Sequence, residues 1–240
     1  TIILMRKTVF SAILMLIASV ACPHLWGQEA LAVPDNLMPG LLGDSVAVRA
    51  DSLLNRSLET FKTLKFKKFD GAPLDSVSPL AYECFEQGCE ALAAQTPDSK
   101  EWYQAKEVLR DVSRDLLAGA FFYSRNGNQP DMTRFARAFL DISLLDAFKG
   151  EEVEVDQGTL AMLAYIAASG AYNEKNFAKA IDYFRIYLAT GDDKQREQVY
   201  IFMTQSCLQS GQWDLGIAVA DEALKVYPGQ KHILLSLIHI

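Results

Sequence analysis

The sequence predicts an all-α fold in which antiparallel helix pairs stack in chain order, an α-solenoid. Three observations lead to this fold class. From Ser78 onward, apolar residues recur at helical spacing almost without interruption. No segment alternates apolar and polar residues for long enough to indicate a strand. Two similar helical patterns also begin 36 residues apart, at Asn176 and Gln212, which is typical of a repeat architecture.

Composition limits the size and the partners of the protein. The chain has 240 residues, of which 50% are hydrophobic, enough to bury the core of an ordinary domain. Its formal net charge is −7, and we find no basic stripe that offsets this acidity. Because an acidic surface repels phosphate backbones, we expect no nucleic-acid partner.

Residues 1–28 are predicted to hold upstream residues and a secretory signal peptide. Basic residues follow Met5, and the apolar run 9–21 comes next. This run is shorter than the ~20 residues that span a bilayer, but it suits a signal peptide. Small residues before Cys22 suit signal peptidase, and a cut before Glu29 is the alternative. We therefore expect export to the periplasm or the outer membrane.

The stretch "ASVAC", which ends at Cys22, also resembles a relaxed lipobox. Lipidation of Cys22 is therefore an alternative to simple cleavage. It is the one route by which we expect this protein to be held at a membrane.

Residues 29–77 are predicted to form an N-terminal segment with one amphipathic helix. Proline and glycine are expected to interrupt this segment at Pro34, Pro39, Gly40 and Pro73. Between these breaks, the stretch 46–66 has large apolar residues at helical spacing.

Asp-Ser-apolar tripeptides occur around Ser45, Ser52 and Ser76. They resemble the signal of a periplasmic O-glycosylation system in some Gram-negative anaerobes, which would make these serines modification sites. The alternative is that Asp and Ser serve here as ordinary helix caps and turn formers.

Residues 78–234 are predicted to form the helical array. Helix-stop chemistry, as in "RNGNQPD", "ATGDDK" and "QSGQ", separates the helical stretches. The predicted helices cover residues 81–94, 99–123, 131–148, 158–172, 176–190, 194–210 and 212–227. Residues 82–112 could in addition form a degenerate helix pair.

The repeated pattern gives the packing of each helix pair. Ala180 and Gly216 occupy the same register position, where a small residue lets the two helices approach closely. Phe177 and Trp213 occupy another, where a large residue is expected to fill the space beside the turn. A third copy begins at Asn128, 48 residues before Asn176. Each pair needs a neighbour to bury its apolar face, so the pairs must stack.

These segments resemble tetratricopeptide repeats over about residues 116–228. The last copy fits the pattern best, whereas Tyr187, Asp192 and Gln129 depart from it in the earlier copies. The residues that carry the resemblance are Ala120, Tyr123, Phe177, Ala180, Phe184, Trp213, Gly216, Ala220, Ala223 and Pro228. The resemblance implies a right-handed superhelix that binds a protein or peptide in a concave groove.

The groove of such an array is lined by the first helix of each pair. The candidate groove residues are Ser124, Arg125, Tyr165, Ser169, Tyr172, Asn173, Gln205 and Gln209. Only Arg125 and Asn173 are similar to the carboxylate clamp that some tetratricopeptide proteins use. For Tyr165 and Tyr172, packing against the next helix pair is the alternative to ligand contact.

The sequence offers little for catalysis. The histidines, His24, His232 and His239, lie near the two ends, so a serine or cysteine nucleophile would lack a base. Cys84, Cys89 and Cys207 are interpreted as structural thiols, without metal-site spacing. The acidic stretch 149–158 is interpreted as a solvated loop. We therefore expect no catalytic residue, cofactor or metal site.

We thus expect a non-catalytic, exported tetratricopeptide scaffold for protein–protein interaction or assembly in the envelope, of open oligomeric state. One alternative is the helical front part of a larger exported enzyme, for example a peptidase. Another is a glycan-binding envelope lipoprotein. Residues 235–240, "LSLIHI", resemble the translation of a transposon-end sequencing adapter, so we expect them to be adapter-derived and the array to continue.

Overall fold

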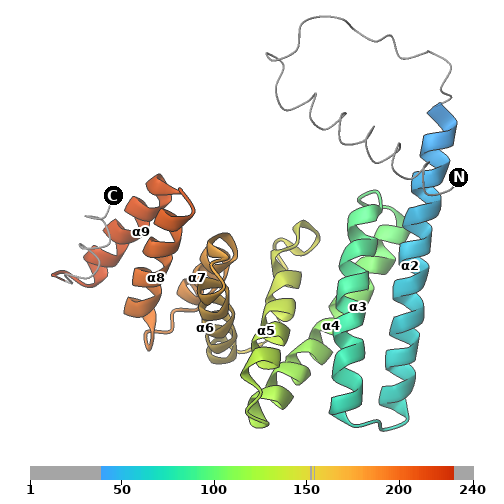
Figure 1. The fold of residues 1–240 in the computed structure, drawn as a ribbon, viewed down its shortest axis with the longest axis horizontal. Helices are drawn as coiled ribbons and strands as arrows, with labels where there is room; N and C mark the ends of the chain where they lie inside the picture. Colours follow the sequence, from blue (N-terminus) through green and yellow to red (C-terminus); the bar gives the residue numbers. More distant parts are fainter. Residues whose placement is uncertain (1–38, 152, 154, 230–240) are drawn as a thin grey trace, which may run out of the picture. The chain divides into compact units, whose positions relative to one another are not determined.

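The computed structural model describes residues 39–151, 153 and 155–229. Within these residues every regular element is helical, and the helices follow one another in chain order across Figure 1. The predicted all-α class is therefore confirmed. The signal segment, Cys22 and residues 235–240 lie outside the described part.

The described residues form eight α-helices and one short 3-10 helix. They are α2 (Pro39–Phe69), α3 (Leu74–Ala94), α4 (Lys100–Arg125), α5 (Gln129–Leu144), η1 (Asp146–Phe148), α6 (Gln157–Asn173), α7 (Phe177–Thr190), α8 (Arg196–Gln209) and α9 (Trp213–Val226). From α3 to α9, each helix packs on the next. None of the described helices is apolar over the length needed to cross a bilayer.

Helix starts follow the capping residues. Ser99 begins α4, and its hydroxyl accepts a hydrogen bond from the Trp102 amide at 3.0 Å. Asp156 begins α6 in the same way, accepting from the Thr159 amide at 2.9 Å. These side chains satisfy amides that have no partner within the helix, which is why polar residues mark the predicted boundaries.

Two boundaries in the N-terminal part differ from the prediction. Pro39 does not interrupt the chain but is the first residue of α2, where its fixed φ suits a helix start. α3 begins at Leu74, so the expected domain boundary at residue 78 falls inside a helix, which also contains Pro79. Leu64 of α2 is fully buried in the core that the later helices share, so α2 belongs with the array.

Helices α2, α4, α6 and α8 all end in the same turn. Shortly after each helix, one residue has a positive φ: Gly71 (74°), Gly127 (70°), Lys175 (60°) and Gly211 (74°). Its amide donates to the carbonyl three residues earlier, and the next amide donates to the carbonyl five residues earlier, at 2.8–3.2 Å. This hydrogen-bond pattern is the Schellman motif.

The recurring turn defines the helix pairs as α2–α3, α4–α5, α6–α7 and α8–α9. The last three pairs keep the register that the sequence predicted, with Asn128, Asn176 and Gln212 at equivalent positions. Residues 82–112, predicted as one helix pair, lie in the consecutive helices α3 and α4, which pack together. The recurring turn, however, joins α3 to α2 and α4 to α5.

Small residues allow close approach within the pairs. A Cβ atom on Gly216 would lie 3.2 Å from the Cβ of Cys207 in α8, which confirms the predicted close contact of that pair. In the α4–α5 pair, a Cβ on Gly119 would lie 2.5 Å from Cδ1 of Phe135. Larger side chains at these glycines would force the helices apart.

Candidate functional site

The structure divides the predicted groove residues among different environments. Tyr165 borders one hollow, between α4, α6 and α7, and Asn173 borders another, between α3, α5 and α6. Tyr172 and Gln205 are brought together, whereas Arg125 and Gln209 are exposed at the ends of their helices. Ser124 is half-buried, and the Oγ of Ser169 is enclosed without a hydrogen-bond partner among the described residues.

Tyr172 packs against the next helix pair. Its ring lies 4.8 Å from that of Phe202 in α8 and 5.8 Å from that of Phe177. Its hydroxyl donates to Oε1 of Gln205 at 2.8 Å. Both side chains are thus engaged with each other between α6 and α8, and they contribute to stacking of the pairs.

Tyr165 belongs to an open hollow that we call the α4–α6 groove. Its apolar floor comes from helices of two successive pairs, and its polar rim comes from the N-terminus of α6 and the α7–α8 connection. Its volume is about 540 Å³. It is lined by Phe121, Asp156, Gly158, Thr159, Ala161, Met162, Tyr165, Ile166, Tyr187, Asp192, Lys194 and Gln195. This volume falls in the range of ligand-binding clefts, about 300–1,000 Å³.

Met162 is the most exposed of the large apolar residues in this floor, with 39% of its surface accessible. Phe121 and Tyr165 flank it, both half-buried. A methionine beside aromatic rings offers an adaptable apolar contact, because its side chain is unbranched and polarisable.

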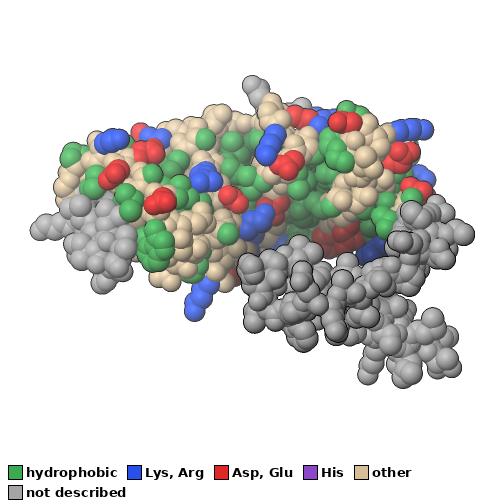
Figure 2. Space-filling view, turned by 90° about the horizontal axis from the view of Figure 1, so that it is seen from above, with side chains coloured by type: hydrophobic (Ala, Val, Ile, Leu, Met, Phe, Trp, Pro, Cys, Tyr) green, Lys and Arg blue, Asp and Glu red, His purple; other side chains and the backbone are tan. Residues whose placement is uncertain are grey.

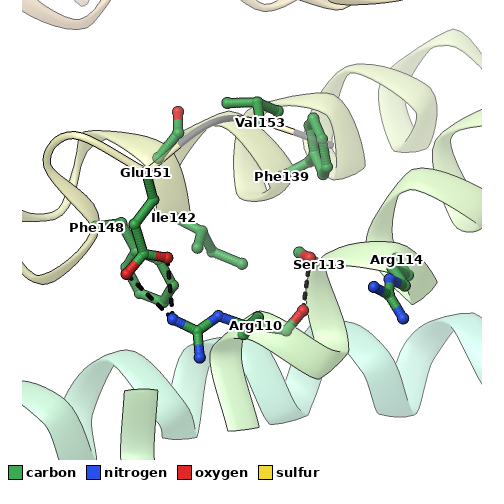
Figure 3. A pocket seen from close by; sticks show the side chains of 9 residues that line it. Arg110, Ser113, Arg114, Phe139, Ile142, Phe148, Glu151 and Val153 are labelled. Atoms are coloured by element: carbon green, nitrogen blue, oxygen red, sulfur yellow. Dashed lines mark hydrogen bonds and ion pairs between the residues drawn. The ribbon is translucent and has the colours of Figure 1, made fainter. Parts of the chain in front are cut away.

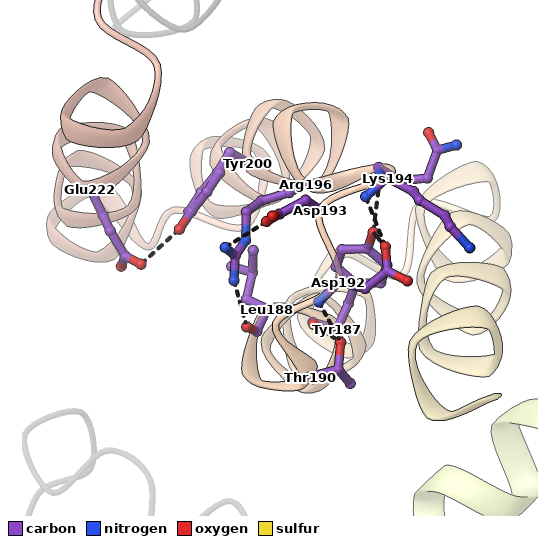
Figure 4. Close-up of polar contacts among 10 residues, drawn as sticks. Tyr187, Leu188, Thr190, Asp192, Asp193, Lys194, Arg196, Tyr200 and Glu222 are labelled. Carbon is purple, nitrogen blue, oxygen red and sulfur yellow. Dashed lines mark hydrogen bonds and ion pairs between the residues drawn. The ribbon is translucent and has the colours of Figure 1, made fainter. Parts of the chain in front are cut away.

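Tyr187 and Asp192 fix the rim of the groove (Figure 4). The Tyr187 hydroxyl donates to Oδ1 of Asp192 at 3.2 Å and accepts from the Gln195 amide at 2.9 Å. Asp192 also accepts from the Lys194 amide at 2.8 Å. Burial raises the pKa of the Tyr187 phenol, so the hydroxyl keeps the proton that it donates.

These are the two residues at which the middle repeat departs from the tetratricopeptide pattern. The phenol of Tyr187 extends from α7 to the first residues of the connection, where its hydroxyl donates a hydrogen bond to Asp192. The departures are therefore coupled: each supplies the other's hydrogen-bond partner. Arg196 closes the connection further, donating to Asp193 at 2.8 Å and to the Leu188 carbonyl at 3.3 Å.

The remaining signature residues mostly lie in the core. Phe184, Ala120, Ala180, Ala220 and Ala223 are buried, whereas Tyr123 and Phe177 are half-buried and Pro228 is exposed.

Trp213 differs from its expected role, because 48% of its surface is exposed. Phe177 contacts the ring of Tyr172, but the residue equivalent to Tyr172 in α8 is Leu208, which offers no ring. Trp213 therefore does not fill the space beside its turn.

A polar cluster joins α5 to α7. Oδ1 of Asp141 accepts from Nζ of Lys179 at 2.7 Å and from the hydroxyl of Tyr183 at 2.8 Å. Burial, with a smaller effect of Asp141, raises the pKa of the Tyr183 phenol well above its usual value. The ammonium of Lys179 and the hydroxyl of Tyr183 thus both bond to the same carboxylate oxygen. We therefore assign this cluster to packing of the α4–α5 pair on the α6–α7 pair.

The three cysteines in the described part of the chain are single thiols. Cys84, Cys89 and Cys207 form no disulfide, and burial raises the pKa of all three. Within the described ranges, no cluster of histidine, cysteine, aspartate and glutamate has the composition and closeness of a metal site.

The described acids of the stretch before α6, Glu151 and Asp156, are exposed, as expected of a solvated loop, but Glu151 is also tied to α4. Glu151 forms ion pairs with Lys106 at 2.7 Å and with Arg110 at 3.0 Å, both from α4. Hydrogen bonds from these two side chains hold the pKa of Glu151 below its usual value. The hydrophobic residues Val153 and Val155, which alternate with acids, pack on the core and were the signal that sequence reasoning missed.

The candidate modification sites lie at or near the N-terminal part of the array. Ser52 is exposed on α2, and the hydroxyl of Ser76 donates to the Pro73 carbonyl at 3.0 Å in the first turn of α3. The side chain of Ser45 and the whole of Cys22 lie outside the described part.

Comparisons with protein-family models, with curated proteins and with solved structures find no match. The helix pairs, their turns and the α4–α6 groove are therefore the basis for assigning a function.

Proposed function

We propose that this protein is a non-catalytic, exported scaffold of the tetratricopeptide type, which binds a segment of another protein in the α4–α6 groove. The observation that carries this proposal is the groove itself. Exposed Met162 and half-buried Tyr165 of α6, together with half-buried Phe121 of α4, form an apolar floor that spans two helix pairs. A right-handed superhelix of these pairs, as the resemblance implies, would place the groove on its concave side.

The groove offers chemistry suited to an extended peptide. Methionine and aromatic residues are enriched in protein interfaces, where they make large contacts at low entropic cost. Asp156, Lys194 and Gln195 surround this floor with polar groups that can orient a backbone. Because the rim is held by Tyr187, the groove is already formed before a partner arrives, which lowers the cost of binding.

The export part of the proposal depends on the signal peptide predicted in residues 1–28. It places the scaffold in the periplasm or at the outer membrane, where an assembly partner would be another envelope protein. Lipidation at Cys22 would hold it at the membrane.

Photo-crosslinking from the groove tests the scaffold role. A photoreactive phenylalanine analogue at Met162, in the native host, should give an adduct with one envelope protein, identified by mass spectrometry. The same analogue at Val226, an exposed position on α9, is the matched control and should not give that adduct.

The identified partner then permits a quantitative check. Met162→Glu should weaken its binding about tenfold or more, because a charge would lie in an apolar contact. Val226→Glu should leave the affinity within about twofold. If neither position yields a protein adduct in intact cells, the scaffold proposal is wrong.

A further inference from the structure

The connection between α5 and α6 is longer than its counterpart between α7 and α8. Asn128 precedes Asn176 by 48 residues, whereas Asn176 precedes Gln212 by 36, so one repeat carries 12 extra residues. Part of this length lies in the helices, because α5 has 16 residues and α6 has 17, against 14 each for α7 and α8. The rest lies in the connection, which covers residues 145–156, whereas the α7–α8 connection covers only residues 191–195.

The extra residues fold back onto α4. Phe148 is buried, and the cations of Lys106 and Arg110 lie 5.2 Å and 5.9 Å from the centre of its ring. Glu151 then pairs with both of these cations. The connection is thus held against α4 by two successive contacts: cation–π contacts at Phe148 and ion pairs at Glu151.

Folding back leaves a hollow between α4, α5 and the connection, which we call the connection hollow (Figure 3). It has a volume of about 120 Å³, suited to one bulky side chain. Phe139 and Val153 lie on one side and Arg110, Ser113 and Arg114 on the other. It is lined by Arg110, Ser113, Arg114, Phe139, Ile142, Ser143, Phe148, Glu151 and Val153. Figure 2 shows that hydrophobic side chains gather in a hollow on the upper face, with charged side chains around it.

The edge of the hollow along α4 is basic. Lys106, Arg110 and Arg114 follow one another at steps of four residues, so they lie along one face of the helix. The protein as a whole is acidic, with a net charge of −7, so this short row was overlooked in the sequence. Nη2 of Arg110 contacts both carboxylate oxygens of Glu151, at 3.1 Å and 3.0 Å, which shows that this edge accepts a carboxylate.

We propose that the connection hollow is a second docking point, which receives one bulky apolar side chain of a partner segment whose neighbouring residue is Asp or Glu. The apolar lining takes the side chain, and Arg110 pairs with the neighbouring carboxylate. Nη2 of Arg110 is engaged by Glu151, whereas Nη1 contacts the exposed Glu107 only at 3.4 Å. Because a guanidinium has five N–H donors, a partner carboxylate can take the place of Glu107 beside Glu151. A basic segment offers Arg110 no carboxylate and so lacks this ion pair. This inference rests on the proposed scaffold function and adds the chemistry of the partner.

Three labelled heptapeptides test the proposal by fluorescence anisotropy with the protein lacking residues 1–28. The first is acidic with a central Phe, the second has Ala in place of Phe, and the third has Lys in place of every Asp and Glu. We expect the first to bind at least about tenfold more tightly than the other two. Equal binding of the Phe and Ala peptides, tighter binding of the Lys peptide, or no binding at about 1 mM would each overturn the proposal.

Variants assign the binding to the hollow. Arg110→Glu should lower the affinity for the acidic Phe peptide at least about tenfold. Ser143→Leu fills the hollow, and because the Ser143 hydroxyl bonds only within its own helix, to the Leu140 carbonyl, the fold should persist. In this variant the preference for Phe over Ala should disappear. Arg56→Glu is the matched control, an exposed arginine on α2, and should change the affinity less than about twofold.

Two further results would each contradict the inference without contradicting the scaffold role. If Arg110→Glu and Ser143→Leu melt like the wild type yet bind the peptide equally well, the hollow is not its site and the inference fails. If the protein dimerises and Ser143→Leu abolishes the dimer, the hollow belongs to a second copy and the inference also fails. In both cases the crosslink from Met162 still decides the scaffold role separately.

Discussion

At the scale of single residues, glycine positions define how closely the helices pack. Gly119 faces the ring of Phe135, and Gly170 faces Thr133 and Arg137 across the α5–α6 contact. In each case a methyl group has no room without movement of the neighbour. The sequence pattern identified Gly216 but not Gly119, because only the former occupied a recognised repeat position.

We predict that Gly119→Ala lowers the free energy of unfolding by about 1–3 kcal/mol, measured by urea denaturation. The reason is that the new Cβ would lie 2.5 Å from a ring carbon of Phe135. The effect runs against the helix propensity of alanine, which alone would stabilise by up to about 1 kcal/mol.

A double-mutant cycle isolates this contact. In a Phe135→Leu background the ring is absent, so Gly119→Ala should lower the free energy of unfolding clearly less than in the wild type. An equal cost in both backgrounds would contradict the close approach of α4 and α5 at this point.

At the scale of the elements, the Schellman turn is the best-defined repeated unit of the molecule. Three of its four positive-φ positions hold glycine, whereas α6 ends with Lys175 at a φ of 60°. A residue with a Cβ pays about 1–2 kcal/mol for the left-handed conformation. Lys175 is therefore a locally strained residue in an otherwise regular series.

We predict that Lys175→Gly raises the free energy of unfolding by up to about 1 kcal/mol, because glycine adopts this conformation without strain. Gly211→Lys, the reverse change in the equivalent turn, should destabilise by a similar amount. Chemical denaturation of both variants gives the measurement. A destabilised Lys175→Gly would mean that the lysine side chain makes a contact that outweighs the strain.

The elements show which features were accessible from sequence. Helix limits from α4 to α9 could be predicted to within a few residues, because caps such as Ser99 and Asp156 are local signals. The α2–α3 pair could not, because α3 begins at Leu74 whereas its helix was predicted from residue 81, and no repeated aromatic marks this pair.

The candidate sites were harder to predict than the helices. The groove rim depends on how Tyr187 meets the α7–α8 connection, and the hollow depends on Glu151 reaching α4 across 41 residues of chain. Contacts of that kind are set by tertiary packing and leave no periodic signal. The groove list derived from repeat register therefore included Tyr165 but missed Phe121 and Met162.

At the scale of the whole molecule, buried thiols and phenols link stability to alkaline pH. Burial, with a smaller contribution from Glu83, raises the pKa of Cys84 from 9.0 to about 12. Burial, with a smaller contribution from Asp141, raises that of Cys89 from 9.0 to about 12. The unfolded chain loses these protons near pH 9, whereas the folded protein retains them, so raising the pH favours unfolding.

We predict that the free energy of unfolding is independent of these thiols below about pH 9 and falls between pH 9 and pH 12. The Cys84→Ala, Cys89→Ala double variant should lose less stability over this window than the wild type. Urea denaturation in reducing buffer at pH 8, 10 and 11 measures both slopes. Equal slopes would show that the thiols do not contribute.

The long α5–α6 connection has an evolutionary consequence. The Schellman turn within each helix pair is formed by residues of that pair alone. Residues added between pairs therefore leave these turns unchanged, as the identical turns before and after this connection show. Connections between pairs are therefore the places where such a chain can acquire a new surface by insertion while its core sequence stays fixed. For the protein engineer, the shorter α3–α4 and α7–α8 connections are the corresponding sites for grafting a loop.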